Sequence, residues 1–185
     1  MIYLYGINSI TQYLIYELNV ESDKIEILVD NEFYNTDNFN GYKIKKINDI
    51  NFKSNDSVYV CLGYKNLKKR YEMCQFFLSK NILKSYISPS SFIHNSTKID
   101  KGNIVMNNVF IDFDVNIGIG NIFWNNSIIS HNAVIKNSNF FATGSVIGGF
   151  TSVNNFCFFG FNSSVKQKIT VPNDTKLGAN KFMDI

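Results

Sequence analysis

The sequence has few of the features that mark secreted, membrane-bound or nucleic-acid-binding proteins. Its three cysteines, Cys61, Cys74 and Cys157, form no closely spaced pair, which argues against a disulfide framework and favours a reducing compartment. The formal net charge of +3 is too small an excess to indicate binding to nucleic acid or to an anionic membrane. No apolar run reaches about 18 residues, so no membrane-spanning helix is expected. The first residues show no signal peptide, and a cytoplasmic location is expected.

The composition is that of a folded protein. Hydrophobic residues make up 45% of the 185 residues and charged residues 18%, which is too apolar for a disordered chain. This length allows one ordinary domain or two small ones. The two parts of the chain, residues 1–86 and 87–185, follow different sequence patterns.

Residues 1–86 alternate between strand-like and helix-like segments. Strands are expected at residues 2–6, 25–30 and 57–63, and helices at residues 9–18 and 67–83, the first with Ser9 as its N-cap. Strands separated by helices predict parallel βαβ units. The fold class expected for this part is therefore a Rossmann-like α/β domain.

In a parallel sheet, ligands bind at the carboxyl ends of the strands. The glycine pattern GxGxxG is absent, which disfavours a dinucleotide. Lys68, Lys69 and Arg70 are expected on a solvated helix face. An alternative is that this domain binds nothing and only caps the second part of the chain. The residues expected at the strand ends to contact a substrate are Gly6, Asn8, Ser9, Asp30, Asn31, Gly63, Tyr64 and Lys65.

Residues 87–185 carry a repeat of six residues. Such a hexad repeat suits neither an α-helix, with its period of about 3.6, nor a single strand, with its period of about 2. Each hexad is expected to give one short strand and one turn, and three hexads to close a triangular coil of 18 residues. A large apolar residue stands at every sixth position: Ile87, Ile93, Ile99, Val105, Ile111, Ile117, Phe123, Ile129, Ile135, Phe141, Ile147, Val153, Phe159, Val165, Val171 and Leu177.

The coil register predicts which residues lie above one another. Phe123, Phe141 and Phe159 are 18 residues apart and should stack inside one wall. Asn103, Asn121 and Asn139 should form a ladder at one corner, where asparagine tolerates a positive φ. The ends of such a stack are open, so capping and oligomerisation are expected.

The hexads resemble the left-handed β-helix of the hexapeptide acyltransferases. A small βαβ domain followed by hexads is similar to the sialic-acid O-acetyltransferases and the bacillosamine and perosamine N-acetyltransferases of bacterial surface-polysaccharide pathways. Four segments carry the likeness: ISHNAVI at 129–135 resembles the catalytic segment, SVIGGF and FFGFNSSV the following coils, and VPNDTKLGANK the C-terminal segment. At the N-terminus, YGINS resembles the family's glycine-rich turn, LVDN its Asp-rich strand end, and VCLGYKNLKKR its third strand and the following helix.

Acyl transfer needs a base for the nucleophile's proton and a donor for the developing oxyanion. Neutral imidazole suits the first role near pH 7, and the chain has two histidines, His94 and His131. The resemblance assigns the base to His131 and the thioester-binding N–H to Gly149. It also implies contacts of the acyl donor with Gly149, Gly160 and Gly178. An equally weighted alternative is that Gly148 and Gly149 only form a turn and take no part in binding the thioester.

Asn132 departs from the family, which has an acid beside the histidine. Asn132 can hold one tautomer of the imidazole by a hydrogen bond, but it cannot stabilise an imidazolium by charge. Asp114 lies 18 residues earlier and is predicted to act as a substitute carboxylate. The competing interpretation is a solvated turn aspartate.

The resemblance implies an acetyl-CoA-dependent N-acetyltransferase that acts on a nucleotide-linked 4-amino-4,6-dideoxy sugar, with direct transfer in a ternary complex. It implies a homotrimer, with acetyl-CoA as co-substrate and no metal, nucleic acid or membrane insertion. Two alternatives remain open. One is O-acetylation of a sialic acid or another sugar, and the other is a non-catalytic β-helix that serves as a structural or binding subunit.

Overall fold

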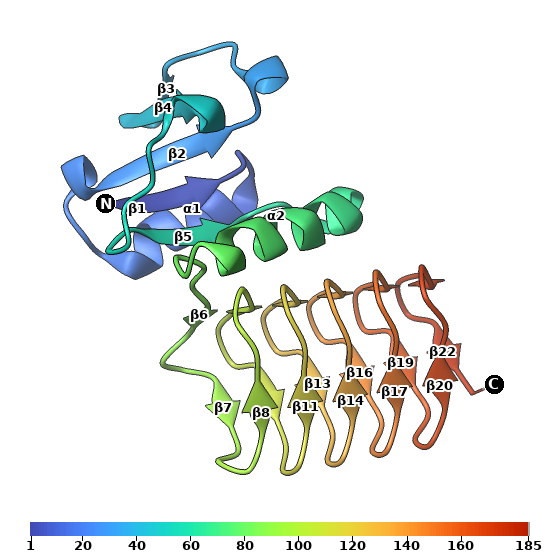
Figure 1. The fold of residues 1–185 in the computed structure, drawn as a ribbon. Helices are drawn as coiled ribbons and strands as arrows, with labels where there is room; N and C mark the ends of the chain where they lie inside the picture. The colour runs from blue at the N-terminus through green and yellow to red at the C-terminus, as the bar shows by residue number, and fades with distance from the viewer. Residues whose placement is uncertain (185) are drawn as a thin grey trace. The chain divides into compact units, whose positions relative to one another are not determined.

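The computed structural model describes residues 1–184, and the chain separates into two compact units that divide after Lys84 (Figure 1). Each unit is described by itself. Among residues 1–184, no helix has the length and apolar character needed to cross a bilayer.

The N-terminal unit is a five-stranded sheet with strand order β3-β4-β2-β1-β5. The four strands β4, β2, β1 and β5 are parallel, whereas β3 pairs antiparallel with β4. The parallel strands agree with the predicted βαβ pattern, and the Rossmann-like class of the whole unit stays a prediction. Its elements are β1 (Ile2–Tyr5), α1 (Ser9–Leu18), β2 (Ile25–Val29), β3 (Asn38–Phe39), β4 (Tyr42–Lys46), β5 (Ser57–Val60) and α2 (Leu67–Ser79).

The structure differs from the sequence prediction in two elements of this unit. The hairpin of β3 and β4 was not predicted from the sequence, although Tyr42 and Ile44 alternate with lysines in β4; β3 has only two residues and gives no pattern of its own. The second helix ends at Ser79 rather than at residue 83, since Asn81 adopts a positive φ of 59° that interrupts the helix.

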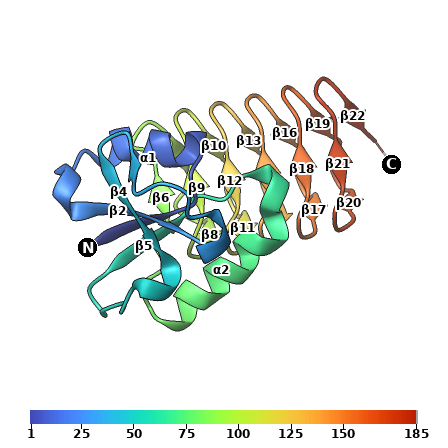
Figure 2. The ribbon, with the colours of Figure 1, turned by 90° about the horizontal axis from the view of Figure 1, so that it is seen from above.

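The C-terminal unit consists of short parallel strands that stack into three sheets, as the coils in Figures 1 and 2 show. Partners lie 18 residues apart, as in the pairing of Ile111 with Ile129. This arrangement fits the left-handed β-helix that the hexads predict. The first sheet holds β7 (Phe92–Ile93), β10 (Phe110–Ile111), β13 (Ile128–Ile129), β16 (Val146–Ile147), β19 (Ser164–Val165) and β22 (Phe182–Met183). The second holds β8 (Lys98–Ile99), β11 (Asn116–Ile117), β14 (Val134–Ile135), β17 (Ser152–Val153) and β20 (Thr170–Val171). The third holds β6 (Tyr86–Ile87), β9 (Ile104–Val105), β12 (Ile122–Phe123), β15 (Phe140–Phe141), β18 (Phe158–Phe159) and β21 (Lys176–Leu177).

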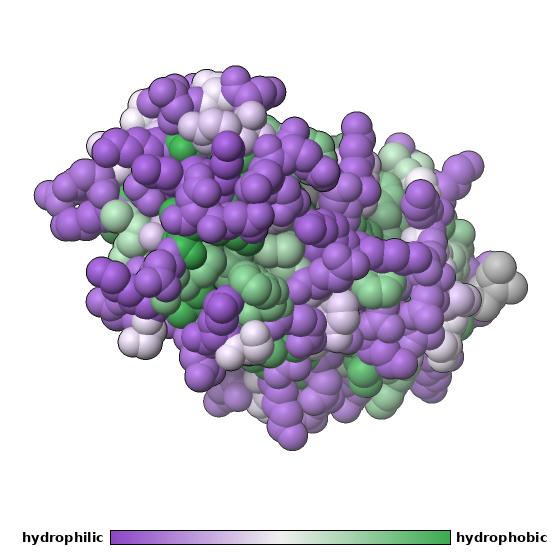
Figure 3. All heavy atoms as spheres, turned by 45° about the horizontal axis from the view of Figure 1, so that its top comes forward, coloured by the Kyte–Doolittle hydropathy of each residue, from purple (hydrophilic) through white to green (hydrophobic). Residues whose placement is uncertain are grey.

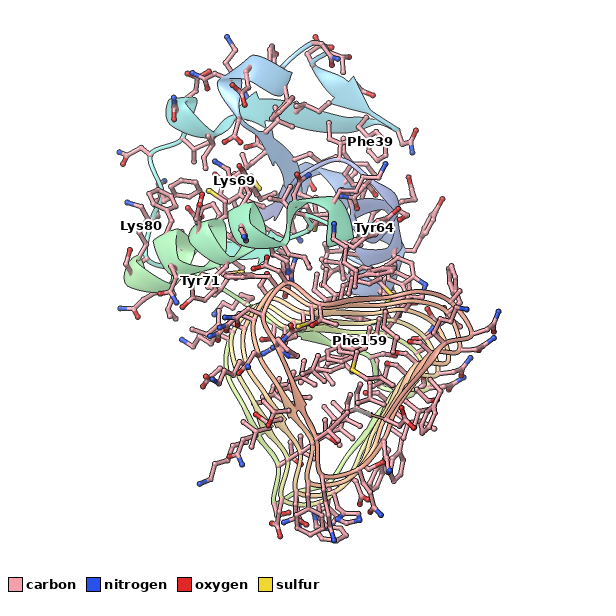
Figure 4. All side chains as sticks on the ribbon, turned by 90° about the vertical axis from the view of Figure 1, so that its right-hand side faces the viewer. Phe39, Tyr64, Lys69, Tyr71, Lys80 and Phe159 are labelled. Atoms are coloured by element: carbon pink, nitrogen blue, oxygen red, sulfur yellow. The ribbon has the colours of Figure 1, made fainter. Side chains whose placement is uncertain are left out.

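The core of the coils is formed by the apolar residues of the hexad repeat. From Val105 to Leu177 every one of them is buried, whereas Ile87, in the first strand of the stack, is 42% exposed. Phe141 stacks between Phe123 and Phe159, with ring centroids 4.9 Å apart on both sides and rings nearly parallel. The predicted aromatic stack is therefore confirmed, and Figure 4 shows Phe159 pointing into the space between the three walls.

The predicted asparagine ladder is present, but its backbone differs from the prediction. The Oδ1 atoms of Asn103 and Asn121 accept from the backbone N–H one coil further on, at 2.8 and 2.9 Å. The positive φ belongs to the preceding residue of each coil, for example 74° at Gly120 and 51° at Ser138. The ladder asparagines therefore serve to satisfy buried backbone groups rather than to make the turn.

Candidate functional site

The carboxyl ends of β1, β2 and β5 lie at one edge of the N-terminal sheet. The Gly6 N–H donates to the Leu28 carbonyl at 2.9 Å, and the Cys61 N–H donates to the Tyr5 carbonyl at 2.8 Å. Gly6 has a φ of +111°, and an added Cβ would lie 3.0 Å from Leu62, so this position requires glycine. The three predicted strand ends are thus brought together.

Asn8, rather than Ser9, is the N-cap of α1, which corrects the sequence prediction. The Asn8 Oδ1 accepts from the Ile10 N–H at 2.8 Å, as an N-cap does. Its Nδ2 donates to the Cys61 carbonyl at 2.7 Å and so connects the turn after β1 to the end of β5. Ser9 is the first helical residue and is exposed.

Asp30 lies at the end of β2 and has two partners. The Tyr5 hydroxyl donates to its Oδ1 at 2.7 Å, and the Lys69 ammonium lies 3.5 Å from its Oδ2. Burial raises the pKa of Tyr5 above its ordinary value, and the hydrogen bond to Asp30 adds to the increase. The phenol therefore stays protonated and continues to donate at physiological pH. Figure 4 marks Lys69 on α2.

Arg70 is fully buried, so the expectation of a solvated helix face is wrong for this residue, whereas Lys68 and Lys69 are exposed as expected. Its guanidinium donates to the Val60 carbonyl and to the Leu62 carbonyl, the latter at 3.3 Å. These carbonyls lie at the end of β5, just before the predicted substrate segment that begins at Gly63. A buried guanidinium requires such partners, because its charge is costly to remove from water.

The remaining predicted residues of this unit, Asn31, Tyr64 and Lys65, are exposed near the same edge, where Figure 4 marks Tyr64. A pocket of about 490 Å³ extends from Asp30 between α2 and the segment 47–52, and Figure 4 marks Lys80 in its lining. Of the predicted residues it includes Asp30 alone. The lining residues are Asp30, Ile47, Asn48, Ile50, Phe52, Glu72, Met73, Phe76 and Lys80.

In the C-terminal unit, His131 follows β13 and its imidazole is partly exposed. The Nδ1 atom lies 3.1 Å from Oδ1 of Asn132. An amide oxygen can only accept, so this contact favours the tautomer with a proton on Nδ1. The lone pair is then on Nε2, as a general base requires.

Gly149 lies one coil beyond His131, in close contact with the imidazole. An added Cβ at Gly149 would lie 2.9 Å from Cε1 and 3.0 Å from Nε2 of His131. Gly148 has the same constraint toward the next coil, because its Cβ would lie 2.5 Å from the Gln167 nitrogen. Neither glycine has a positive φ. Both are therefore needed for close approach between coils rather than for a turn.

Two aromatic rings enclose the imidazole of His131. The ring of Phe113, one coil earlier, stacks on it with centroids 5.1 Å apart and an interplanar angle of 9°. The ring of Phe150, one coil later, meets it edge to face at 5.1 Å and 88°. Neither residue was predicted from the sequence, although Phe113 stands 18 residues before His131 and Phe150 stands 19 residues after it, so the coil register places both beside the imidazole.

Asp114 does not reach the imidazole. It is exposed at the corner one coil before Asn132, with a φ of 56°, and its N–H donates to the Ser96 hydroxyl at 2.9 Å. Within residues 1–184, no hydrogen bond or ion pair joins its carboxylate to His131, so its catalytic role stays a prediction. His94 contacts the same Ser96 hydroxyl through Nδ1 at 2.9 Å.

The two further glycines predicted to contact the acyl donor differ in their surroundings. Gly160 is packed against the next coil, since an added Cβ would lie 2.5 Å from the Ala179 nitrogen. Gly178 has open space, with the nearest atom, Cγ of Lys181, 3.7 Å from its Cβ position. Across the described residues 1–184, no cluster of three or more metal-ligating side chains occurs.

No protein-family model matches the sequence, and no curated protein is significantly similar to it. Solved structures do match. The acetyltransferase domain of PglB from Neisseria gonorrhoeae, in complex with acetyl coenzyme A, superposes with a TM-score of 0.82 at 16% identity, covering 98% of this chain and 91% of that chain. A variant of perosamine N-acetyltransferase from Caulobacter crescentus, in complex with CoA and GDP-perosamine, gives a TM-score of 0.72 at 18% identity, with 99% and 88% covered. At these identities the likeness shows the fold.

Proposed function

We propose that the protein is an acetyl-CoA-dependent acetyltransferase that acts on a nucleotide-linked 4-amino-4,6-dideoxy sugar. The observation that carries the proposal is the position of His131, with Nδ1 on Asn132 and the Nε2 edge against Gly149 of the next coil. Two structures with the same fold, bound to acetyl coenzyme A or to CoA and GDP-perosamine, support this choice of donor and acceptor.

The proposed reaction is a direct transfer. The amine nitrogen of the sugar attacks the carbonyl carbon of the acetyl thioester, and Nε2 of His131 takes the amine proton. The carbonyl oxygen gains charge and accepts a hydrogen bond from the Gly149 N–H, which within residues 1–184 donates to no other group. The carbon–sulfur bond then breaks, and the sulfur takes the proton from the imidazolium. The products are the N-acetylated sugar and free CoA thiol.

The N-terminal unit is proposed to bind the nucleotide sugar at the carboxyl edge of its sheet. Asp30 would accept from a hydroxyl of the ligand, because Tyr5 and Lys69 leave lone pairs of its carboxylate free. The backbone of residues 63–65, placed by Arg70 at the end of β5, lies at the same edge. An Asp30→Asn variant should raise the KM for the nucleotide sugar and leave the KM for acetyl-CoA unchanged.

A homotrimer is proposed as the working form. The outward side of the sheet that contains β7, β10 and β22 exposes large apolar side chains, with Phe92 at 51% and Phe182 at 62%. Burial of such groups between copies would be favourable. The face of the molecule seen in Figure 3 is mostly hydrophilic, with apolar residues gathered in several patches. Sedimentation equilibrium at several protein concentrations tests the trimer, and a monomer at all concentrations would refute it.

The function is tested by thiol release from acetyl-CoA with a panel of UDP-, TDP- and GDP-linked 4-amino sugars. We expect turnover with one of them and a loss of about 100- to 10,000-fold in kcat in His131→Ala. His94→Ala is the matched control and should retain activity. Acetylation of hydroxyl acceptors only would favour O-acetylation. Turnover that survives His131→Ala would reject the mechanism, and absence of both turnover and CoA binding would favour a non-catalytic subunit.

A further inference from the structure

The backbone of Phe150 has a conformation that suits its side chain poorly. Its φ is 59°, in the left-handed region, where bulky residues are rare outliers. The same corner position is held by Asp114 and Asn132 in the two preceding coils, with φ of 56° and 58°. Short polar residues of this kind tolerate the region, because their side chains bond locally to the backbone. A phenylalanine here therefore costs stability that an asparagine would not.

The ring of Phe150 has a defined place despite this cost. The Phe150 ring packs edge to face against the imidazole of His131, and the ammonium of Lys168 lies 5.9 Å from the centroid of the Phe150 ring. The Phe150 N–H donates to the His131 carbonyl at 3.0 Å, so backbone and side chain both act on the same residue. Strained residues that persist at a candidate site point to a role in function.

Phe113 completes the enclosure from the preceding coil. Its ring lies against the face of the imidazole, and the Phe113 carbonyl accepts from the Asn132 N–H at 3.0 Å. Phe113 thus contacts both the base and the residue that sets its tautomer. The faces of aromatic rings carry negative charge density and attract a cation.

We propose that Phe113 and Phe150 are positioning residues that hold the imidazole of His131 between two rings and stabilise its charged form, in place of the carboxylate that Asn132 cannot supply. This inference rests on the proposed acetyltransferase activity. The strain at Phe150 is retained because the ring fixes the base in the orientation that directs Nε2 toward Gly149.

The decisive variant is Phe150→Asn, because stability and activity should change in opposite directions. Asparagine tolerates the left-handed conformation at residue 150 better than phenylalanine does, so Tm should rise by about 2–6 °C. The loss of the ring should lower kcat about two- to tenfold and leave the KM for acetyl-CoA unchanged. Phe156→Asn is the matched control, since Phe156 has a φ of 63° at a different corner. It should raise Tm in the same way and leave kcat unchanged. A Phe150→Asn enzyme with unchanged or higher kcat would overturn the proposal.

Phe113→Leu tests the second ring without backbone strain. It should lower kcat about two- to tenfold. Adding Asn132→Asp to this variant should restore most of the loss, because a carboxylate replaces the stabilisation that the ring gave. A purely structural role for Phe113 would show as a lower Tm and no rescue. Tyr16→Leu, at a ring on α1 that is 73% exposed, should change neither kcat nor Tm.

A spectroscopic measurement separates the enclosure from the proposed function. The protein has only two histidines, so His94→Ala assigns the ring signals of His131. Its ring protons should be shifted upfield by the stacked Phe113 and should move back in Phe113→Leu. If this shift is present but no acceptor is acetylated, the proposed function fails and the enclosure stands. An unshifted His131 signal would refute the enclosure itself.

Discussion

The imidazole of His131 lies so close to Gly149 that a side chain at residue 149 would fit only if the imidazole moved. A Cβ at residue 149 would be 2.9 Å from Cε1 and 3.2 Å from the His131 carbonyl oxygen. Because the carbonyl belongs to the backbone of the stack, the flexible ring is the part that would have to move.

Gly149→Ala is therefore expected to displace the ring rather than to unfold the coil. A shift of about 1 Å in a catalytic group can cost about 100-fold, and kcat/KM should fall by this order. Gly118→Ala is the control, since its Cβ would lie 2.5 Å from Oδ1 of Asn137, away from His131. It should lower Tm and retain kcat/KM. Equal losses of kcat/KM in both variants would contradict this account.

Asn132→Asp should increase activity. A carboxylate at this position accepts from Nδ1 of His131, as the amide oxygen does, and adds a charge that stabilises the imidazolium. A partly exposed pair of this kind is worth about 0.2–1 kcal/mol, so kcat should rise by no more than about fivefold. Asn126→Asp, with a φ of 59° at another corner, is the matched control and should leave kcat unchanged. A fall in kcat in Asn132→Asp would refute the tautomer assignment.

Asn8→Ala should destabilise the N-terminal unit. The loss of an N-cap costs about 0.5–2 kcal/mol, and here the hydrogen bond to the Cys61 carbonyl is lost as well. Ser9→Ala removes a neighbouring exposed hydroxyl and should change the free energy of unfolding by less than about 0.5 kcal/mol. Urea titration of both variants measures the difference. A larger loss in Ser9→Ala would mean that the cap is assigned to the wrong residue.

The stability of the protein should fall at alkaline pH. Burial raises the pKa of Cys61 to about 12 and that of Cys157 to about 11, from ordinary values near 9. The folded state thus keeps protons that the unfolded state loses above about pH 9, so the stabilisation is complete below that pH and is lost as pH rises. Each thiol should contribute a slope approaching about 1.4 kcal/mol per pH unit above pH 9. Urea titrations from pH 7 to pH 10 measure it.

Cys61→Ala provides the control for the alkaline prediction. It should be less stable at pH 7 but should show a shallower decline with pH, because one linked proton is removed. An unchanged slope in this variant would show that other groups cause the decline.

The C-terminal unit was predictable in detail because every hexad forms the same local structure, one short strand and one turn. Once the coil length was known, the stack of Phe123, Phe141 and Phe159 and the pairing of His131 with Gly149 followed from counting. The enclosure of His131 by Phe113 and Phe150 follows from the same count. It was missed because outward aromatic residues do not interrupt the hexad pattern.

The N-terminal unit was less predictable because its details depend on contacts distant in the sequence. The bounds of α1 agree with the helical spacing, yet the cap is Asn8, whose amide also bonds to the end of β5. Arg70 stands in a run of basic residues that resembles a solvated face. Its burial depends on the carbonyls at the end of β5, which no local pattern indicates.

The pairing of strands at a separation of 18 residues limits how the length of the C-terminal unit can change. An insertion of one residue would turn every later side chain away from its place above its neighbour. The removal of a whole coil would leave the remaining contacts equivalent to those before. The length of this unit can therefore evolve only in integral steps, and the coils that carry His131 and Gly149 must remain adjacent through every such change.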